Sequence, residues 1–181
     1  RALCFLLLAS CAPLSIRPTV KIGLVAPFEG RYRYVGYDII YAVRLALREA
    51  NAAGGVGGYN VELVAYDDGA DPAMAVQQAR KLAADPQVVA VIGHFREETT
   101  WAAANVYAET GIPLVAPAVF VPMLTEEGAE VYRLSPPAEM LAGALLQHLD
   151  KLGQDQVALV TDGGPLGSIV QQLVQSYRVQ V

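Results

Sequence analysis

The sequence predicts an α/β protein with a doubly wound parallel sheet, and three observations support this. Short apolar runs rich in branched residues alternate with amphipathic stretches at helical spacing. The connections between these runs are long enough to hold a helix, which parallel strands need in order to cross over. With 181 residues, 54% of them hydrophobic and 17% charged, the chain is long and apolar enough to bury a core, which excludes disorder.

The first half of the chain shows the expected order of elements. VKIGLVAPF, from Val20, predicts a buried strand, because the run is short and rich in branched residues. Apolar residues at helical spacing over 39–50 predict a helix, which ends where Gly54 or Gly55 can take the left-handed conformation. NVELVAYDD, from Asn60, predicts the second strand.

The second half repeats this order. Asp71 and Pro72 predict the start of a helix, because Asp caps helix amides and Pro is tolerated in the first turn. The later elements are expected at VVAVIG, at a helix through Ala103 and Tyr107, at IPLVAPA, at VYRLSPP, at a helix from Leu141, at QVALVTD and at a last helix through Ile169. The order predicts a sheet covered by helices on both faces.

The first residues have the composition of a secretory leader. RALCFLLLASCAP combines a positive residue, an apolar run too short to span a bilayer, and small residues. Its LASC segment, ending at Cys11, resembles the lipobox of bacterial lipoproteins. We therefore expect residues 1–17 to form a leader and tether that is lipidated at Cys11; a buried strand or helix with two ordinary cysteines is the alternative. Because cleavage before Cys11 removes Cys4, we expect no disulfide and no cysteine-based metal site.

Charge and motifs disfavour several function classes. The net charge of -5 comes without a basic block, so no nucleic-acid partner is expected. DGGPLGS follows an expected strand but lacks both the dinucleotide spacing and the P-loop lysine, which favours a plain turn. There is no G-x-S-x-G elbow, and His94 and His148 are interpreted as structural. Asp67, Asp68 and Asp71 are interpreted as solvated turn acids. We expect no enzymatic activity, no cofactor and no metal.

The carboxyl ends of the expected strands are the natural place for a ligand. These ends are the turns after Ala26, Asp67, Gly93, Pro117 and Asp162. The helix after Gly93 would present free amides and its positive dipole end to an anion. The same turn, however, contains Arg96, Glu97 and Glu98.

Four stretches resemble the leucine/isoleucine/valine-binding protein family, the type I periplasmic solute-binding proteins of ABC importers. They are IGLVAPFEGRYRYVG, NAAGGVGGYNVELVAYDDGADPAMAVQQARKL, VVAVIGHF and YAETGIPLVAPA…PMLTEEG. The resemblance implies two Rossmann-like lobes joined by a hinge, with residues 18–135 as lobe 1 and 136–181 as the beginning of lobe 2. Because the sequence ends at Val181, we expect either a fragment or an unusually truncated protein.

The resemblance also implies which residues contact the solute. In family members the turn after the third strand supplies a Ser hydroxyl and helix amides to the solute's carboxylate, and Glu97 holds that position here. The turn after the fourth strand supplies a small residue and a Thr, where this chain has Val119 and Phe120. In the second lobe a Tyr commonly precedes the Gly of the strand-end turn, and Leu166 stands there instead.

Glu97 changes the ligand that we expect. Glu97 or Glu98 can accept the helix's own amide bonds, so a ligand carboxylate would meet occupied donors and a like charge. Arg96 restores anion binding if it points into the cleft. We therefore expect a solute other than a standard branched-chain amino acid. Its amine or hydroxyl groups would face Glu97, and its remaining part would pack on Phe120, Tyr32 or Tyr34. The alternative is a solvated helix start beside a cleft without function.

Together these observations predict a receptor in the periplasm or at the outer face of the bacterial membrane. It would be anchored by lipid through Cys11, close around a small solute by hinge motion, and deliver the solute to an ABC permease. A ligand-sensing receptor domain of the same fold is the alternative, followed by a small α/β hydrolase.

Overall fold

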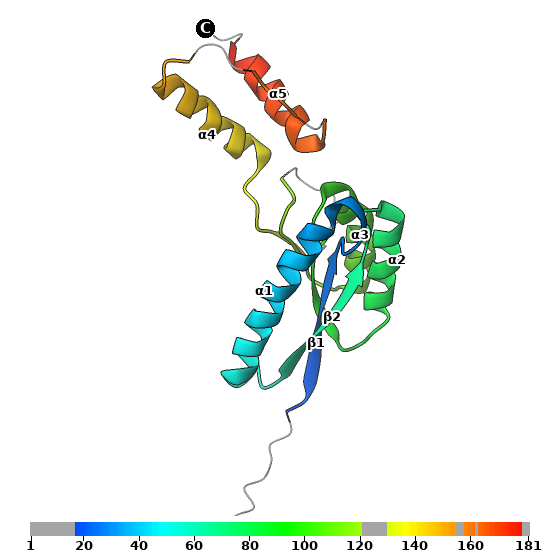
Figure 1. Cartoon of the computed structure of the whole chain (residues 1–181). Coiled ribbons are helices and arrows are strands. Elements are labelled where there is room, and N and C mark those ends of the chain that lie inside the picture. The colour runs from blue at the N-terminus through cyan, green and yellow to red at the C-terminus, as the bar shows by residue number, and fades with distance from the viewer. Residues whose placement is uncertain (1–16, 121–129, 155–157, 162, 179–181) are drawn as a thin grey trace, which may run out of the picture.

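The computed structural model describes residues 17–120, 130–154, 158–161 and 163–178. A 5-stranded sheet of parallel strands has the order β2-β1-β3-β4-β5. The strands are β1 (Thr19–Ala26), β2 (Asn60–Asp67), β3 (Val88–Ile92), β4 (Leu114–Ala116) and β5 (Val131–Arg133). Figure 1 shows α1 (Arg33–Ala52) on one face of the sheet and α2 (Pro72–Ala83) with α3 (Glu97–Thr110) on the other. The predicted doubly wound α/β fold is confirmed.

The helix ends follow from local sequence. Asp71 caps α2, since its Oδ1 accepts a hydrogen bond from the Met74 amide at 2.8 Å, and Pro72 occupies the first turn as predicted. Gly111 ends α3 in the left-handed conformation, with φ at 68°. These signals set where each helix begins and ends relative to the strand that it follows.

The core lies between the sheet and the α2–α3 layer. It contains Val25 and Val91 from neighbouring strands, Leu82 from α2, and Tyr107 from α3, all of them buried. The order of the strands reverses between β1 and β3, because β2 lies on one side of β1 and all later strands lie on the other. In open α/β sheets such a reversal opens a crevice at the carboxyl ends of the strands.

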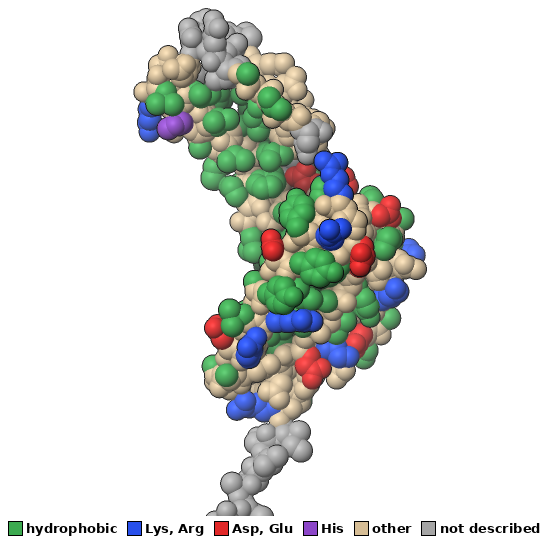
Figure 2. Space-filling view, in the orientation of Figure 1, with side chains coloured by type: hydrophobic (Ala, Val, Ile, Leu, Met, Phe, Trp, Pro, Cys, Tyr) green, Lys and Arg blue, Asp and Glu red, His purple; other side chains and the backbone are tan. Residues whose placement is uncertain are grey.

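The remaining helices, α4 (Ala138–Lys151) and α5 (Pro165–Arg178), pack against each other above the sheet (Figure 1). Figure 2 shows apolar side chains on the surface of this part, and Met140, Leu141 and Leu145 of α4 are exposed. The strand predicted at QVALVTD is not found over its described residues 158–161. Of the described helices, none has the length and apolar composition needed to cross a membrane.

Gly93 allows β1 and β3 to approach closely. Its φ is 142°, and a Cβ built there would clash with the carbonyl oxygen of Val25. Gly143 in α4, in contrast, has no atom within 4 Å of the position of an added Cβ.

We therefore expect Gly93→Ala to lower the free energy of unfolding by roughly 1–3 kcal/mol, because the added methyl group has to push the two strands apart. Urea denaturation followed by circular dichroism measures this loss. Gly143→Ala is the matched control, and it should be neutral or add up to about 1 kcal/mol through helix propensity. Equal stability of the two variants would show that Gly93 does not constrain the strand pair.

An ion pair connects the start of β1 with the loop before β3. The Nζ of Lys21 lies 2.7 Å from Oδ2 of Asp85. This bond, followed by the one from the Gln87 amide, lowers the pKa of Asp85 below its ordinary value of 3.8. A carboxyl group whose pKa is lowered by folding stabilises the fold above the unfolded pKa, and this stabilisation is lost as the pH falls through the folded pKa.

Lys21→Met should therefore reduce stability at neutral pH, and its difference from wild type should shrink as the pH falls below 3.8. Urea titrations at neutral pH and at about pH 3 test this. Asp85→Asn and the double variant complete a double-mutant cycle that isolates the pair. A deficit that does not change with pH would assign the effect to lost packing of the lysine side chain.

Candidate ligand-binding cleft

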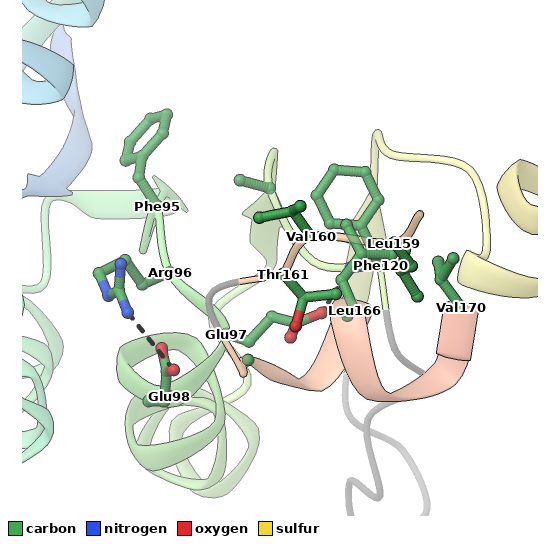
Figure 3. A pocket seen from close by; sticks show the side chains of 13 residues that line it. Phe95, Arg96, Glu97, Glu98, Phe120, Leu159, Val160, Thr161, Leu166 and Val170 are labelled. Atoms are coloured by element: carbon green, nitrogen blue, oxygen red, sulfur yellow. Dashed lines mark hydrogen bonds and ion pairs between the residues drawn. The ribbon is translucent and has the colours of Figure 1, made fainter. Parts of the chain in front are cut away.

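A cavity of about 470 Å³ opens beyond the carboxyl ends of β3 and β4. One wall comes from the turns after these strands, and the other comes from residues 159–161 and from residues 164–170, which include the first turns of α5. The lining side chains are shown in Figure 3 and include Phe95, Arg96, Glu97, Ala118 and Phe120 on the first wall and Leu159, Thr161, Leu166 and Val170 on the second. The cavity therefore joins segments that are far apart in the sequence.

Glu97 connects two strand-end turns within this cavity. Its side chain is 7% exposed, and its Oε1 accepts a hydrogen bond of 2.9 Å from the backbone amide of Phe120. The sequence suggested that Glu97 or Glu98 accepts hydrogen bonds from amides of its own helix, whereas this bond comes from the turn after β4. Figure 3 shows Glu97 between the start of α3 and the side chains of Phe120 and Leu166. The bond holds a carboxylate at the floor of the cavity.

Arg96 lies beside Glu97 but packs on an aromatic ring. Its guanidinium lies 4.3 Å from the centroid of the Tyr32 ring, in the short helix η1 (Gly30–Tyr32) that follows β1. Its Nη2 also lies 3.4 Å from Oε1 of Glu98, the contact drawn in Figure 3. Because 3.4 Å is at the long end of the hydrogen-bond range, stacking on Tyr32 positions Arg96 more firmly than Glu98 does.

The structure brings four of the six residues predicted to bind ligand into one cavity. Arg96, Glu97, Phe120 and Leu166 all line it. The fifth, Tyr34, lines a neighbouring hollow that also includes Arg96. The sixth, Val119, is fully buried and lines neither space; the preceding residue, Ala118, lines the cavity. The lipidation site predicted at Cys11 lies outside the described residues.

Sequence reasoning missed several lining residues. Phe95 directly precedes Arg96 in the turn after β3. The sequence pointed to this turn as a whole but gave no reason to choose Phe95. Thr161 and Val170 belong to the second wall. The expected strand end near Asp162 and the resemblance that singled out Leu166 both pointed to that region, but neither identified Thr161 or Val170.

A buried polar network supports the turn after β3 from below. The Nδ1 of His94 lies 2.7 Å from Oδ2 of Asp68, and both side chains are fully buried. The Nε2 of His94 lies 3.3 Å from the hydroxyl of Tyr107, whose pKa is raised by burial and then by the charge of Asp68, so the phenol keeps its proton. The Oγ1 of Thr100 donates to the carbonyl oxygen of His94 at 3.0 Å. His94 is thus enclosed in the core, as the structural interpretation requires.

The same network corrects the interpretation of the acidic cluster as solvated turn acids. Asp68 is fully buried against His94, and Oδ1 of Asp67 accepts the backbone amides of Phe28 at 2.7 Å and Gly69 at 2.9 Å. Asp71 is the helix cap. Within the described part of the chain, no group of three or more His, Cys, Asp or Glu side chains could hold a metal ion.

Comparison with known proteins assigns the chain to a family. The family model described as "Periplasmic binding protein" matches residues 19–178. The Leu/Ile/Val-binding protein of Escherichia coli K12 is 29% identical over 176 residues, which are 93% of this chain and 48% of that protein. The chain thus spans about half the length of this curated relative.

Solved structures show the same architecture. An ABC transporter substrate-binding protein from Desulfitobacterium hafniense in complex with Leu has a TM-score of 0.75 and 27% identity, and the match covers 90% of this chain and 48% of that one. A solute-binding protein of an ABC transporter from Rhodopseudomonas palustris BisB5, in complex with 3,4-dihydroxy benzoic acid, has a TM-score of 0.78 over 90% and 44% of the two chains; at 22% identity it shows the fold alone. The chain therefore belongs to the periplasmic binding protein family, and within it to the type I leucine/isoleucine/valine-binding proteins.

Proposed function

We propose that the chain is the solute-binding component of an ABC importer of the branched-chain-amino-acid type, and that its solute is not a standard branched-chain amino acid. The observation that carries this proposal is the cavity between the turns after β3 and β4 on one side and residues 159–161 and 164–170 on the other. In this proposal residues 18–135 form lobe 1 and residues 136–181 begin lobe 2. The protein is anchored by lipid at Cys11 and passes its solute to a membrane permease.

A cavity with walls from two segments suits a receptor that closes on its ligand. Phe120 belongs to the turn after β4, whereas Leu166 and Val170 belong to α5. A ligand that touches both walls stabilises the arrangement in which they face each other, and so biases hinge closure. The walls are largely apolar and offer few groups for covalent chemistry, which favours binding over catalysis.

The charge of Glu97 argues against a ligand carboxylate on the floor of the cavity. The Phe120 amide already donates to Glu97, so a carboxylate arriving there would compete for that donor. It would also be repelled by a carboxylate at 7% exposure, where solvent screens charge weakly. An ammonium group or a hydroxyl would be attracted instead, while Phe120 and Leu166 pack against its apolar part.

A thermal-shift screen tests the proposal. We expect amines, polyamines or polyhydroxy solutes to raise the melting temperature more than leucine, isoleucine or valine does. A ligand at a hundredfold excess over its Kd adds about 2.7 kcal/mol, or roughly 5 to 10 °C for a chain of this size. A larger shift with leucine, isoleucine or valine than with any amine or polyhydroxy solute would contradict the proposed ligand preference.

Replacing Glu97 tests which group sets the ligand preference. Glu97→Gln keeps an acceptor for the Phe120 amide and removes the charge. It should therefore raise the Kd of an amine ligand about tenfold and lower the Kd of leucine about tenfold. Glu109→Gln, at the exposed far end of α3, is the matched control and should change neither Kd. Tight binding of leucine by the wild type, unchanged in Glu97→Gln, would show that the carboxylate of Glu97 does not oppose a ligand carboxylate.

A further inference from the structure

A second hollow, of about 650 Å³, adjoins the cavity that Glu97 lines. The two spaces share the lining residues Phe95, Arg96, Glu98 and Gly164, so they meet along the turn after β3. The second hollow extends toward the turn after β1, where Arg31 and Tyr32 line it. It therefore lies at the carboxyl ends of β1 and β3, where the strand order of the sheet reverses.

The two spaces differ in charge. The charged residues that line the second hollow are Arg31, Arg96 and Glu98, which leave one excess positive charge. Those that line the first are Arg96, Glu97 and Glu98, which leave one excess negative charge. The combined cleft thus has an acidic end at Glu97 and a basic end at Arg31, with Arg96 between the two ends.

The basic end is held by the ring of Tyr32. The guanidinium carbons of Arg31 and Arg96 lie 5.5 Å and 4.3 Å from the centroid of this ring. A guanidinium that stacks on a ring keeps its N–H donors directed outward in its own plane, in the geometry that a carboxylate accepts in two places. The contact between Arg96 and Glu98, at 3.4 Å and partly exposed, neutralises the pair only weakly.

We propose that Arg31 and Arg96 form an anion subsite, and that the ligand is an ω-amino acid, a zwitterion with its two charges at opposite ends of a methylene chain. This inference rests on the proposed function and names the class of solute. The ammonium group lies at Glu97, the methylene chain packs along Phe95, and the carboxylate binds Arg31 and Arg96. In an α-amino acid both charged groups are bonded to one carbon, so they cannot serve the two ends of the cleft at once.

Isothermal titration calorimetry with defined probes tests the inference. The probes are γ-aminobutyrate, δ-aminovalerate and ε-aminocaproate, with leucine as the α-amino acid and pentylamine as the analogue of δ-aminovalerate that lacks the carboxylate. We expect at least one ω-amino acid to bind more tightly than both leucine and pentylamine. Failure of pentylamine to bind at all would support the same conclusion, because it would make the carboxylate essential.

Variants at Arg31 assign the carboxylate to its subsite. Arg31→Gln should raise the Kd of the best ω-amino acid about tenfold and change any measurable Kd of pentylamine by less than about twofold. Arg31→Lys, which keeps the charge, should retain most of the affinity. Arg33→Gln is the matched control, since Arg33 is exposed and lines neither space, and it should change nothing.

Two outcomes overturn the inference in distinguishable ways. If another solute from the thermal-shift panel binds but no ω-amino acid binds better than leucine and pentylamine, or if Arg31→Gln affects δ-aminovalerate and pentylamine equally, the anion subsite is wrong while the receptor function stands. If no solute binds to the wild type, the proposed function fails and the inference fails with it.

Discussion

The buried hydrogen bond between His94 and Asp68 is the interaction on which the cleft depends most. It ties the turn after β3 to the turn after β2 at 2.7 Å, with both side chains excluded from solvent. Breaking such a pair by removing one partner leaves a polar group unsatisfied in the core, which costs far more than the net gain from making the bond. This bond therefore fixes the backbone of the turn that presents Arg96 and Glu97.

Glu97, which this turn presents, sets the charge that a ligand meets in the cavity. A carboxylate that accepts the Phe120 amide closes the gap between neighbouring strand ends within the protein itself. Backbone amides at strand and helix ends are ready anion sites in this class of fold, and occupation of one of them by a side chain reverses the charge that a ligand meets. One residue type at one turn can thus change the chemistry of a cleft without altering the sheet beneath it.

Helix α4 has an exposed apolar surface. Met140, Leu141 and Leu145 are exposed although the spacing of apolar residues in this segment predicts a buried face. The relatives that this chain matches are about twice its length. Periodicity identifies the face of a helix that prefers burial, but what covers that face is decided by packing.

Local sequence determined most of the elements, their order and the family, because apolar periodicity, the Asp71 cap and the glycine stops act within a few residues. It also pointed to the strand-end turns, which line the cavity in the structure, since parallel strands bring these turns to one edge. The structure alone decided that Asp68 is buried, that Val119 faces the core, and that Glu97 reaches Phe120, 23 residues away in the sequence. Such contacts depend on which strand ends become neighbours in the order β2-β1-β3-β4-β5, and this is settled by packing across the whole sheet.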